Sequence, residues 1–222
     1  MSNPKPNPIT RRRFLALAGA ALGGTALACS GLTFWVMREP NIELIQTTCG
    51  GGSKMGDRLL VAYATKSGTT SEVAQAIGKS LCDKGAAADV RPVKSVASLD
   101  GYRAVIVGSA IRMGSWLPEA IEFVKKNQAQ LSQMPTAFFT VHLLHLDDSE
   151  ESRQTRQTYT APARQIVTPQ VEAFFAGRLE YAKLSLFENL ISKAMKAQEQ
   201  DLRDWNRIRM WAEGVYPALV SA

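Results

Sequence analysis

One segment in the first half of the chain restricts the fold more than any other. The apolar run 59–62 leads into a hydroxyl-rich loop, and an amphipathic stretch follows in which Val73, Ile77 and Leu81 lie four residues apart. This order predicts a buried strand, a tight loop and a helix. The first-turn amides of a helix are unpaired, and its dipole favours negative charge there. The segment therefore predicts a phosphate-binding loop.

Strand-like and helix-like segments alternate through the rest of the chain. Helical patterns are expected over about 70–84, from 117, over 147–166, and in the tail at 186–195 and 205–215. The strands between them are expected at 59–64, 88–92, 104–108, 136–141 and 171–176. The run 104–108 is apolar throughout, as in a strand that is covered on both faces. The alternation predicts a three-layer α/β domain with a parallel sheet.

The first 37 residues predict a signal or a membrane anchor. Arg11-Arg12-Arg13-Phe14-Leu15 resembles a twin-arginine export signal, and residues 14–37 contain no charged side chain. The alternative is an ordinary signal anchor with a basic flank. A span of 24 uncharged residues exceeds the roughly 20 needed to cross a bilayer. Cleavage after Ala28, lipidation at Cys29 and retention of the segment all stay open.

Positive charge before an apolar segment stays on the cytoplasmic side, so the main domain is expected on the extracytoplasmic side of the membrane. Residues 38–57 predict a flexible linker, since Gly50, Gly51 and Gly52 are consecutive, and residues 58–222 form the main domain.

The three cysteines are too few for a disulfide framework, and their spacing suits no metal. Cys82 is expected to be a small buried residue.

The charge distribution disfavours a nucleic-acid partner. Although the net charge is +6, residues 58–222 carry 20 basic against 17 acidic side chains. No basic stripe interleaved with aromatic residues is present in the sequence. No nucleic acid is therefore expected as a partner.

The loop sequence restricts which phosphate it can hold. It lacks both the glycine–lysine pattern of nucleoside triphosphatases and the glycine pattern of dinucleotide folds. Thr65-Lys66-Ser67-Gly68-Thr69-Thr70 instead resembles the flavodoxin phosphate loop, which binds flavin mononucleotide (FMN) through hydroxyls and amides. The resemblance implies a flavodoxin-like, doubly wound, five-stranded parallel sheet in the order 2-1-3-4-5, with helices on both faces. The uncharged segment 14–37 adds an expected N-terminal apolar helix. A hydroxyl-rich helix cap without a ligand is the alternative, and Thr69 and Glu72 have the spacing of a capping box.

A second loop follows the third strand, where the strand order reverses beside the first strand. The segment Ser109-Ala110-Ile111-Arg112-Met113-Gly114 contains small residues that would let backbone amides approach a flavin ring. Trp116 is expected either to flank that ring or to pack in the core. Arg112 is expected either to meet an acidic substrate or to be solvated.

The third loop follows the fourth strand and contains the two histidines of the chain, His142 and His145. Because this loop borders the same crevice, we expect His142 near the flavin. His145 is expected at the surface. Two histidines three residues apart, without nearby acids or cysteines, make a poor metal site, so no metal is expected.

The resemblance extends beyond the phosphate loop. Residues 108–114, Phe139-Thr140-Val141-His142, residues 175–181 and Arg203-Asp204-Trp205-Asn206 together resemble the menaquinone-dependent protoporphyrinogen oxidase family. That family implies an FMN oxidoreductase that passes electrons from a reduced substrate to a membrane quinone. A membrane-tethered, flavodoxin-like electron carrier that meets redox-protein partners is the alternative, and a flavin-free interaction module is the third reading.

Overall fold

The computed structural model describes residues 42–50, 57–194 and 197–221. The expected signal or anchor, residues 1–37, and its apolar helix lie outside these ranges. Within these ranges, no helix is both long enough and apolar enough to cross a bilayer.

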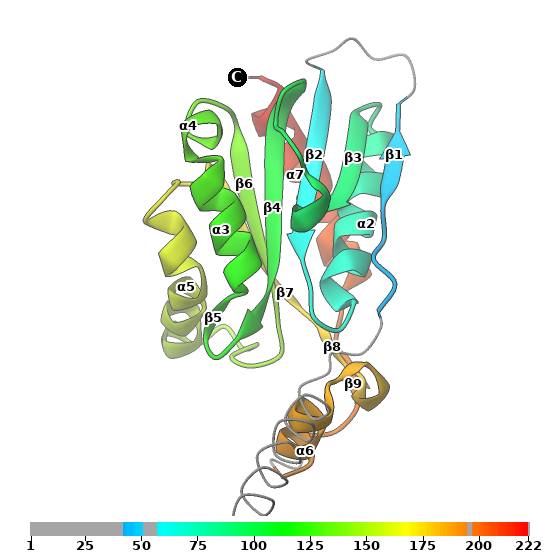
Figure 1. Ribbon diagram of the computed structural model, residues 1–222, viewed down its shortest axis with the longest axis vertical. Coiled ribbons are helices and arrows are strands. Elements are labelled where there is room, and N and C mark those ends of the chain that lie inside the picture. Colours follow the sequence, from blue (N-terminus) through cyan, green and yellow to red (C-terminus); the bar gives the residue numbers. More distant parts are fainter. Residues whose placement is uncertain (1–41, 51–56, 195–196, 222) are drawn as a thin grey trace, which may run out of the picture.

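The described chain is built on one mostly parallel sheet, with strands in the order β1-β3-β2-β4-β6-β7 (Figure 1). Its parallel strands are β2 (Arg58–Ala64), β3 (Ala87–Pro92), β4 (Tyr102–Arg112), β6 (Thr136–His142) and β7 (Val171–Ala176). They reproduce the predicted order of the five-stranded core. The prediction was incomplete at two places, because β1 (Thr47–Cys49) joins the edge of β3 antiparallel and the short β5 (Ser115–Trp116) pairs with β4.

Helices cover both faces of the sheet. Helices α2 (Thr69–Asp83) and α7 (Trp205–Val220) lie on one face, whereas α3 (Pro118–Lys126), α4 (Gln128–Leu131) and α5 (Glu150–Arg164) lie on the other (Figure 1). A short 3-10 helix, η1 (Val93–Ser95), follows β3. An apolar core lies on each face of the sheet, and alternate residues of β2 belong to different cores. Leu59 and Val61 pack toward α2 and α7, and Leu60 packs toward α3. This period of two places both apolar faces of one strand under helices.

A smaller unit follows β7 beyond the carboxyl edge of the sheet (Figure 1). It contains the two-stranded ladder of β8 (Arg178–Leu179) with β9 (Gln200–Asp201), the 3-10 helix η2 (Tyr181–Lys183) and helix α6 (Leu186–Ala194). Its ladder leads directly into α7. The unit therefore lies beside the loops that the sequence assigns to the ligand.

Two predictions, one about the region before β2 and one about Cys82 on α2, are corrected. Residues 38–57 were expected to form a flexible linker, but Thr47–Cys49 pair with Val90, Asp89 and Ala88 of β3. Cys82 was expected to be a small buried residue, but it is half-buried and forms a disulfide with Cys49, with a Cα–Cα distance of 6.2 Å. Because α2 packs over β3 and β1 pairs with β3, the fold brings together two cysteines that are 33 residues apart.

Candidate functional site

The loops after β2, β4, β6 and β7 meet at one edge, because these parallel strands all end there. They enclose a cavity of about 520 Å³, within the usual size range of small-molecule sites. All but three of the predicted site residues line this cavity: Lys66, Ser67, Thr69, Thr70, Ala110, Ile111, Arg112, Met113, Gly114 and His142. Thr65, Gly68 and Ser109 do not line it.

The phosphate loop is braced by its own side chains. The Gly68 amide donates to Thr65 Oγ1 at 3.0 Å, and the Ser71 hydroxyl donates to the Gly68 carbonyl oxygen at 2.6 Å. Gly68 has a φ of 85°, a conformation that glycine adopts without a steric penalty, and it is the N-cap of α2. The hydroxyl of Thr65 is thus occupied in shaping the loop, and the predicted contact of Thr65 with a phosphate stays a prediction.

The loop also contains an unpaired buried hydroxyl. Thr70 is 1% exposed, and its Oγ1 has no hydrogen-bond partner among the described residues. Leaving a buried polar group unpaired is costly, so such an atom indicates a missing ligand or water. The Ser71 amide is bonded to the Gly68 carbonyl oxygen at 3.1 Å. The Thr69 and Thr70 amides before it form, with this hydroxyl, a donor set that fits a phosphate group. The donor set therefore fits the phosphate of FMN.

The second loop places a tight turn at the cavity. Met113 has a φ of 52° and is 97% exposed, and Gly114 has a φ of 76°. Ser109 is fully buried: its hydroxyl donates to the Ala110 carbonyl oxygen at 2.8 Å and accepts from the Leu117 amide at 3.0 Å. The Ser109 side chain therefore holds the loop in shape, and its contact with a ligand stays a prediction.

The structure shows the contacts of two further residues of this loop, and it decides between the alternatives only for Trp116. Trp116 is 2% exposed, donates from Nε1 to Thr140 Oγ1 at 2.8 Å and packs against Phe138. It therefore packs in the core. Arg112 is half-exposed and lies 3.8 Å from the carboxylate of Glu188 on α6, which lines the same cavity. Arg112 is thus paired across the mouth of the cavity.

His142 is 6% exposed, and its Nδ1 lies 2.7 Å from the Leu144 carbonyl oxygen. Burial lowers the pKa of His142 and outweighs this hydrogen bond, so the ring is neutral near pH 7. Because a carbonyl oxygen only accepts, the geometry assigns the proton to Nδ1 and leaves Nε2 free to accept one. His145 is exposed, as expected.

Several residues that line the cavity were missed by the sequence reasoning. Arg178 follows β7 at the same edge of the sheet. Because ligands lie outside the carboxyl ends of parallel strands, its position after β7 was a signal that could have identified it. Tyr159, from the middle of α5, carries no comparable signal in the sequence. Its position depends on how α5 packs beside β5 and β6.

Glu72 connects the phosphate loop to the smaller unit. Its carboxylate pairs with Arg178 at 2.8 Å, with Lys183 at 3.6 Å and with the buried guanidinium of Arg203. The predicted capping box is therefore wrong: the cap of α2 is Gly68, without a side-chain bond, and Glu72 bonds outward instead. Glu180 pairs with Arg178 and Lys183, and Asp201 pairs with Arg203, so three cations and three carboxylates form one balanced network beside the phosphate loop. Within the described ranges, no group of three or more His, Cys, Asp or Glu residues could hold a metal ion.

Comparisons with known proteins define the class. The flavodoxin domain family matches residues 60–205, so the chain belongs to this family. Membership implies FMN as the bound cofactor.

Within that class, the chain is related to enzymes named protoporphyrinogen IX dehydrogenase [quinone]. The Escherichia coli K12 protein is 27% identical over 173 residues, which cover 71% of this chain and 94% of the relative. The Leishmania major protein is 30% identical over 169 residues, which cover 70% and 73%. Among solved structures, an archaeal flavodoxin is 19% identical and covers 63% of this chain and 97% of that one, with a TM-score of 0.39.

Proposed function

We propose that this chain is an FMN-dependent oxidoreductase of the protoporphyrinogen oxidase kind, which passes electrons from a reduced substrate to a membrane quinone. The observation that carries the proposal is the single cavity shared by the phosphate loop, the turn after β4 and His142. The relationship to the quinone-linked dehydrogenases adds the substrate class. When bound, FMN supplies a ring that takes up electrons.

Each loop has a role in this proposal. Residues 65–70 hold the phosphate with amides and hydroxyls, among which the unpaired Thr70 hydroxyl donates to a phosphate oxygen. Residues 110–114 line the same cavity and would lie along the ring, where Gly114 would keep the backbone accessible. Neutral His142 accepts a proton at Nε2 as the substrate is oxidised. The oxidised substrate leaves through the mouth beside Arg112 and Glu188.

The test is direct. The purified full chain is expected to show the absorbance spectrum of bound FMN and to oxidise protoporphyrinogen with a menaquinone analogue as acceptor. A flavin-loaded protein that exchanges electrons with redox proteins, but oxidises no porphyrinogen, would instead be a tethered electron carrier. A colourless protein that takes up no added FMN would overturn both readings.

We further propose that residues 1–37 hold the domain at the membrane, on its extracytoplasmic side. The Cys49–Cys82 disulfide supports this location, because disulfides persist in oxidising compartments and are rare in the cytosol. Protease added to spheroplasts is expected to digest the domain without lysis, while a cytoplasmic control protein survives. Survival of the domain until the membrane is broken would place it inside.

A further inference from the structure

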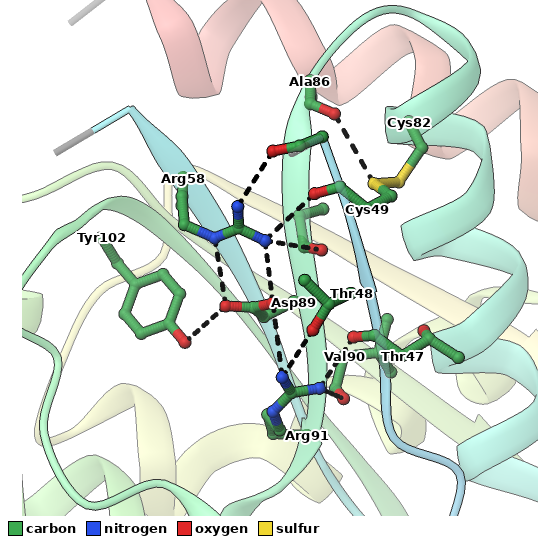
Figure 2. Close-up of polar contacts among 12 residues, drawn as sticks. Thr47, Thr48, Cys49, Arg58, Cys82, Ala86, Asp89, Val90, Arg91 and Tyr102 are labelled. Carbon is green, nitrogen blue, oxygen red and sulfur yellow. Dashed lines mark hydrogen bonds and ion pairs between the residues drawn. A yellow bond between two sulfur atoms is a disulfide. The ribbon is translucent and has the colours of Figure 1, made fainter. Parts of the chain in front are cut away.

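The segment before β2 is fixed to the domain by more than strand pairing. Figure 2 shows the Cys49–Cys82 disulfide beside two arginines that bind the same segment. Arg58 donates to the carbonyl oxygens of Cys49 at 3.0 Å and Gly50 at 3.1 Å. Arg91 donates to the Thr47 carbonyl oxygen at 2.8 Å. Every residue of β1 and the glycine after it is thus bonded to the domain.

A buried carboxylate holds both arginines in place. Asp89 Oδ1 lies 2.9 Å from Arg58 Nη2 and 3.4 Å from Arg91 Nη2, while the Tyr102 hydroxyl donates to Oδ2 at 2.9 Å (Figure 2). Burial alone would raise the pKa of Asp89, but these hydrogen bonds outweigh it and hold the pKa below its ordinary value. The carboxylate is therefore ionised near neutral pH, and the arginines keep their orientation.

The residues before β1 reach the phosphate loop. We call residues 42–45 together with β1 the strap. Its residues Ile42, Glu43 and Ile45 line a cavity of about 300 Å³ with Ser67, Gly68 and Ser71. The Ile45 carbonyl oxygen accepts from the buried Tyr63 hydroxyl at 2.7 Å. Tyr63 lies at the end of β2, two residues before Thr65, whose hydroxyl accepts from the Gly68 amide at 3.0 Å. These two hydrogen bonds, joined by the backbone from Tyr63 to Thr65, thus connect the strap to the N-cap of α2.

We infer that the Cys49–Cys82 disulfide positions the phosphate loop through the strap, so that FMN is held more tightly in the disulfide form than in the dithiol form. This inference rests on the proposed binding of FMN. Reduction by a dithiol breaks the S–S bond: each sulfur gains one electron and one proton, and the dithiol becomes a disulfide. The Cys49–Cys82 bond borders a cavity of about 630 Å³ with Trp205, so a small dithiol can reach it.

The experiment compares FMN dissociation constants of the full chain in detergent, by flavin fluorescence. All proteins carry Cys29→Ser, so that Cys49 and Cys82 are the only cysteines. One sample is kept oxidised, and the other is reduced with dithiothreitol, capped with iodoacetamide and freed of reagent. We expect capping to raise the dissociation constant about tenfold, equivalent to about 1.4 kcal/mol. The Cys49→Ser/Cys82→Ser variant should match the capped sample with or without dithiol.

Tyr63→Phe tests the proposed route. It removes the hydroxyl that bonds Ile45 and leaves the disulfide in place. If the strap acts through this hydroxyl, reduction should change FMN affinity less in the variant than in the parent, because the Tyr63–Ile45 hydrogen bond is already absent. An undiminished effect in Tyr63→Phe would overturn the route.

Hydrogen exchange separates failure of this inference from failure of FMN binding. In flavin-free protein, amides of residues 65–71 should exchange faster after reduction, whereas those of β6 should not change. Equal exchange and equal FMN affinity in both redox forms, with only a lower melting temperature after reduction, would make the disulfide a stabilising bond and overturn the inference. Faster exchange of residues 65–71 without FMN binding by either form would support the positioning role and refute the proposed cofactor.

Discussion

Two polar regions flank the parallel sheet, and they differ in how far their hydrogen-bonding groups are used. At the β1–β3 edge, the Asp89 carboxylate accepts bonds from Arg58 and Tyr102, and the remaining Arg58 donors reach backbone carbonyls. In the crevice at the carboxyl ends of the strands, the Thr70 hydroxyl is buried and has no partner among the described residues. The polar groups at the β1–β3 edge thus bond to one another, whereas the crevice keeps a buried hydroxyl that can still donate to a ligand.

This difference separates groups whose bonds are complete within the fold from groups whose bonds a ligand would complete. A buried polar group that is fully paired stabilises the fold, and one that is unpaired destabilises it unless a ligand completes the bonds. Changes at the edge should therefore lower the free energy of unfolding of the flavin-free protein. Changes in the crevice should weaken FMN binding and leave that free energy intact.

Removing the disulfide is expected to have the largest effect on stability. Closing a loop between residues 33 positions apart restricts the unfolded chain, and the loss of such a bond costs about 2–4 kcal/mol of unfolding free energy. Urea denaturation of flavin-free Cys49→Ser/Cys82→Ser measures this loss against Cys29→Ser. If the two variants have equal unfolding free energies, the disulfide does not stabilise the β1–β3 edge.

Thr70→Val should have the opposite effects, weaker FMN binding without a loss of stability. It removes the unpaired hydroxyl and keeps the shape of the side chain, so the unfolding free energy of the flavin-free protein should not fall. A hydrogen bond to a charged phosphate contributes about 1.5–3 kcal/mol, so FMN affinity should fall about 10- to 100-fold. Ser80→Ala on the same helix, whose hydroxyl bonds the Ala76 carbonyl oxygen, is the control and should bind FMN normally. A destabilised Thr70→Val with normal FMN affinity would abolish the distinction between the two regions.

Asp89→Asn probes the edge through pH. Because the pKa of Asp89 is lower in the folded state than in the unfolded chain, its ionised form stabilises the fold above the unfolded value of about 3.9. This contribution, about 1–2 kcal/mol, is lost as the pH falls through the folded pKa. The wild-type protein should therefore exceed Asp89→Asn in unfolding free energy at pH 7, and the two should converge in acid. A constant gap down to pH 2 would rule out this ionisation as the cause.

The same contrast explains which parts of the fold followed from the sequence. The five parallel strands have six to eleven residues, most of them apolar, and each pattern is strong enough to be recognised locally. Strand β1 has three residues, Thr47-Thr48-Cys49, without an apolar alternation. Its pairing with β3 joins residues about 40 positions apart, and the disulfide joins residues 33 positions apart, so no local pattern reveals either contact.

The sequence predicted which loops form the candidate site, but it did not predict the contacts of their side chains. The switch point correctly brought residues 65–70, 109–114 and 142 to one edge of the sheet. Within the loop, however, Thr65 and Thr70 are chemically equivalent in sequence, and only geometry shows that one hydroxyl is paired while the other is not. The same holds for Arg112, whose partner Glu188 lies on a separate helix.

Arg112→Gln should have a small effect on stability, and its main effect should be on substrate binding. The Arg112–Glu188 pair is partly exposed and separated by 3.8 Å, so its loss should change the unfolding free energy by less than about 1 kcal/mol. If an acidic substrate displaces Glu188 at the mouth of the cavity, Arg112→Gln should raise KM about tenfold, as expected for one lost charge-assisted bond. Glu188→Gln releases Arg112 and should lower KM or leave it unchanged, with kcat unchanged in both variants. Equal KM values in all three proteins would show that Arg112 and Glu188 serve only to hold α6 against the turn after β4, and would assign the whole of substrate recognition to the interior of the crevice.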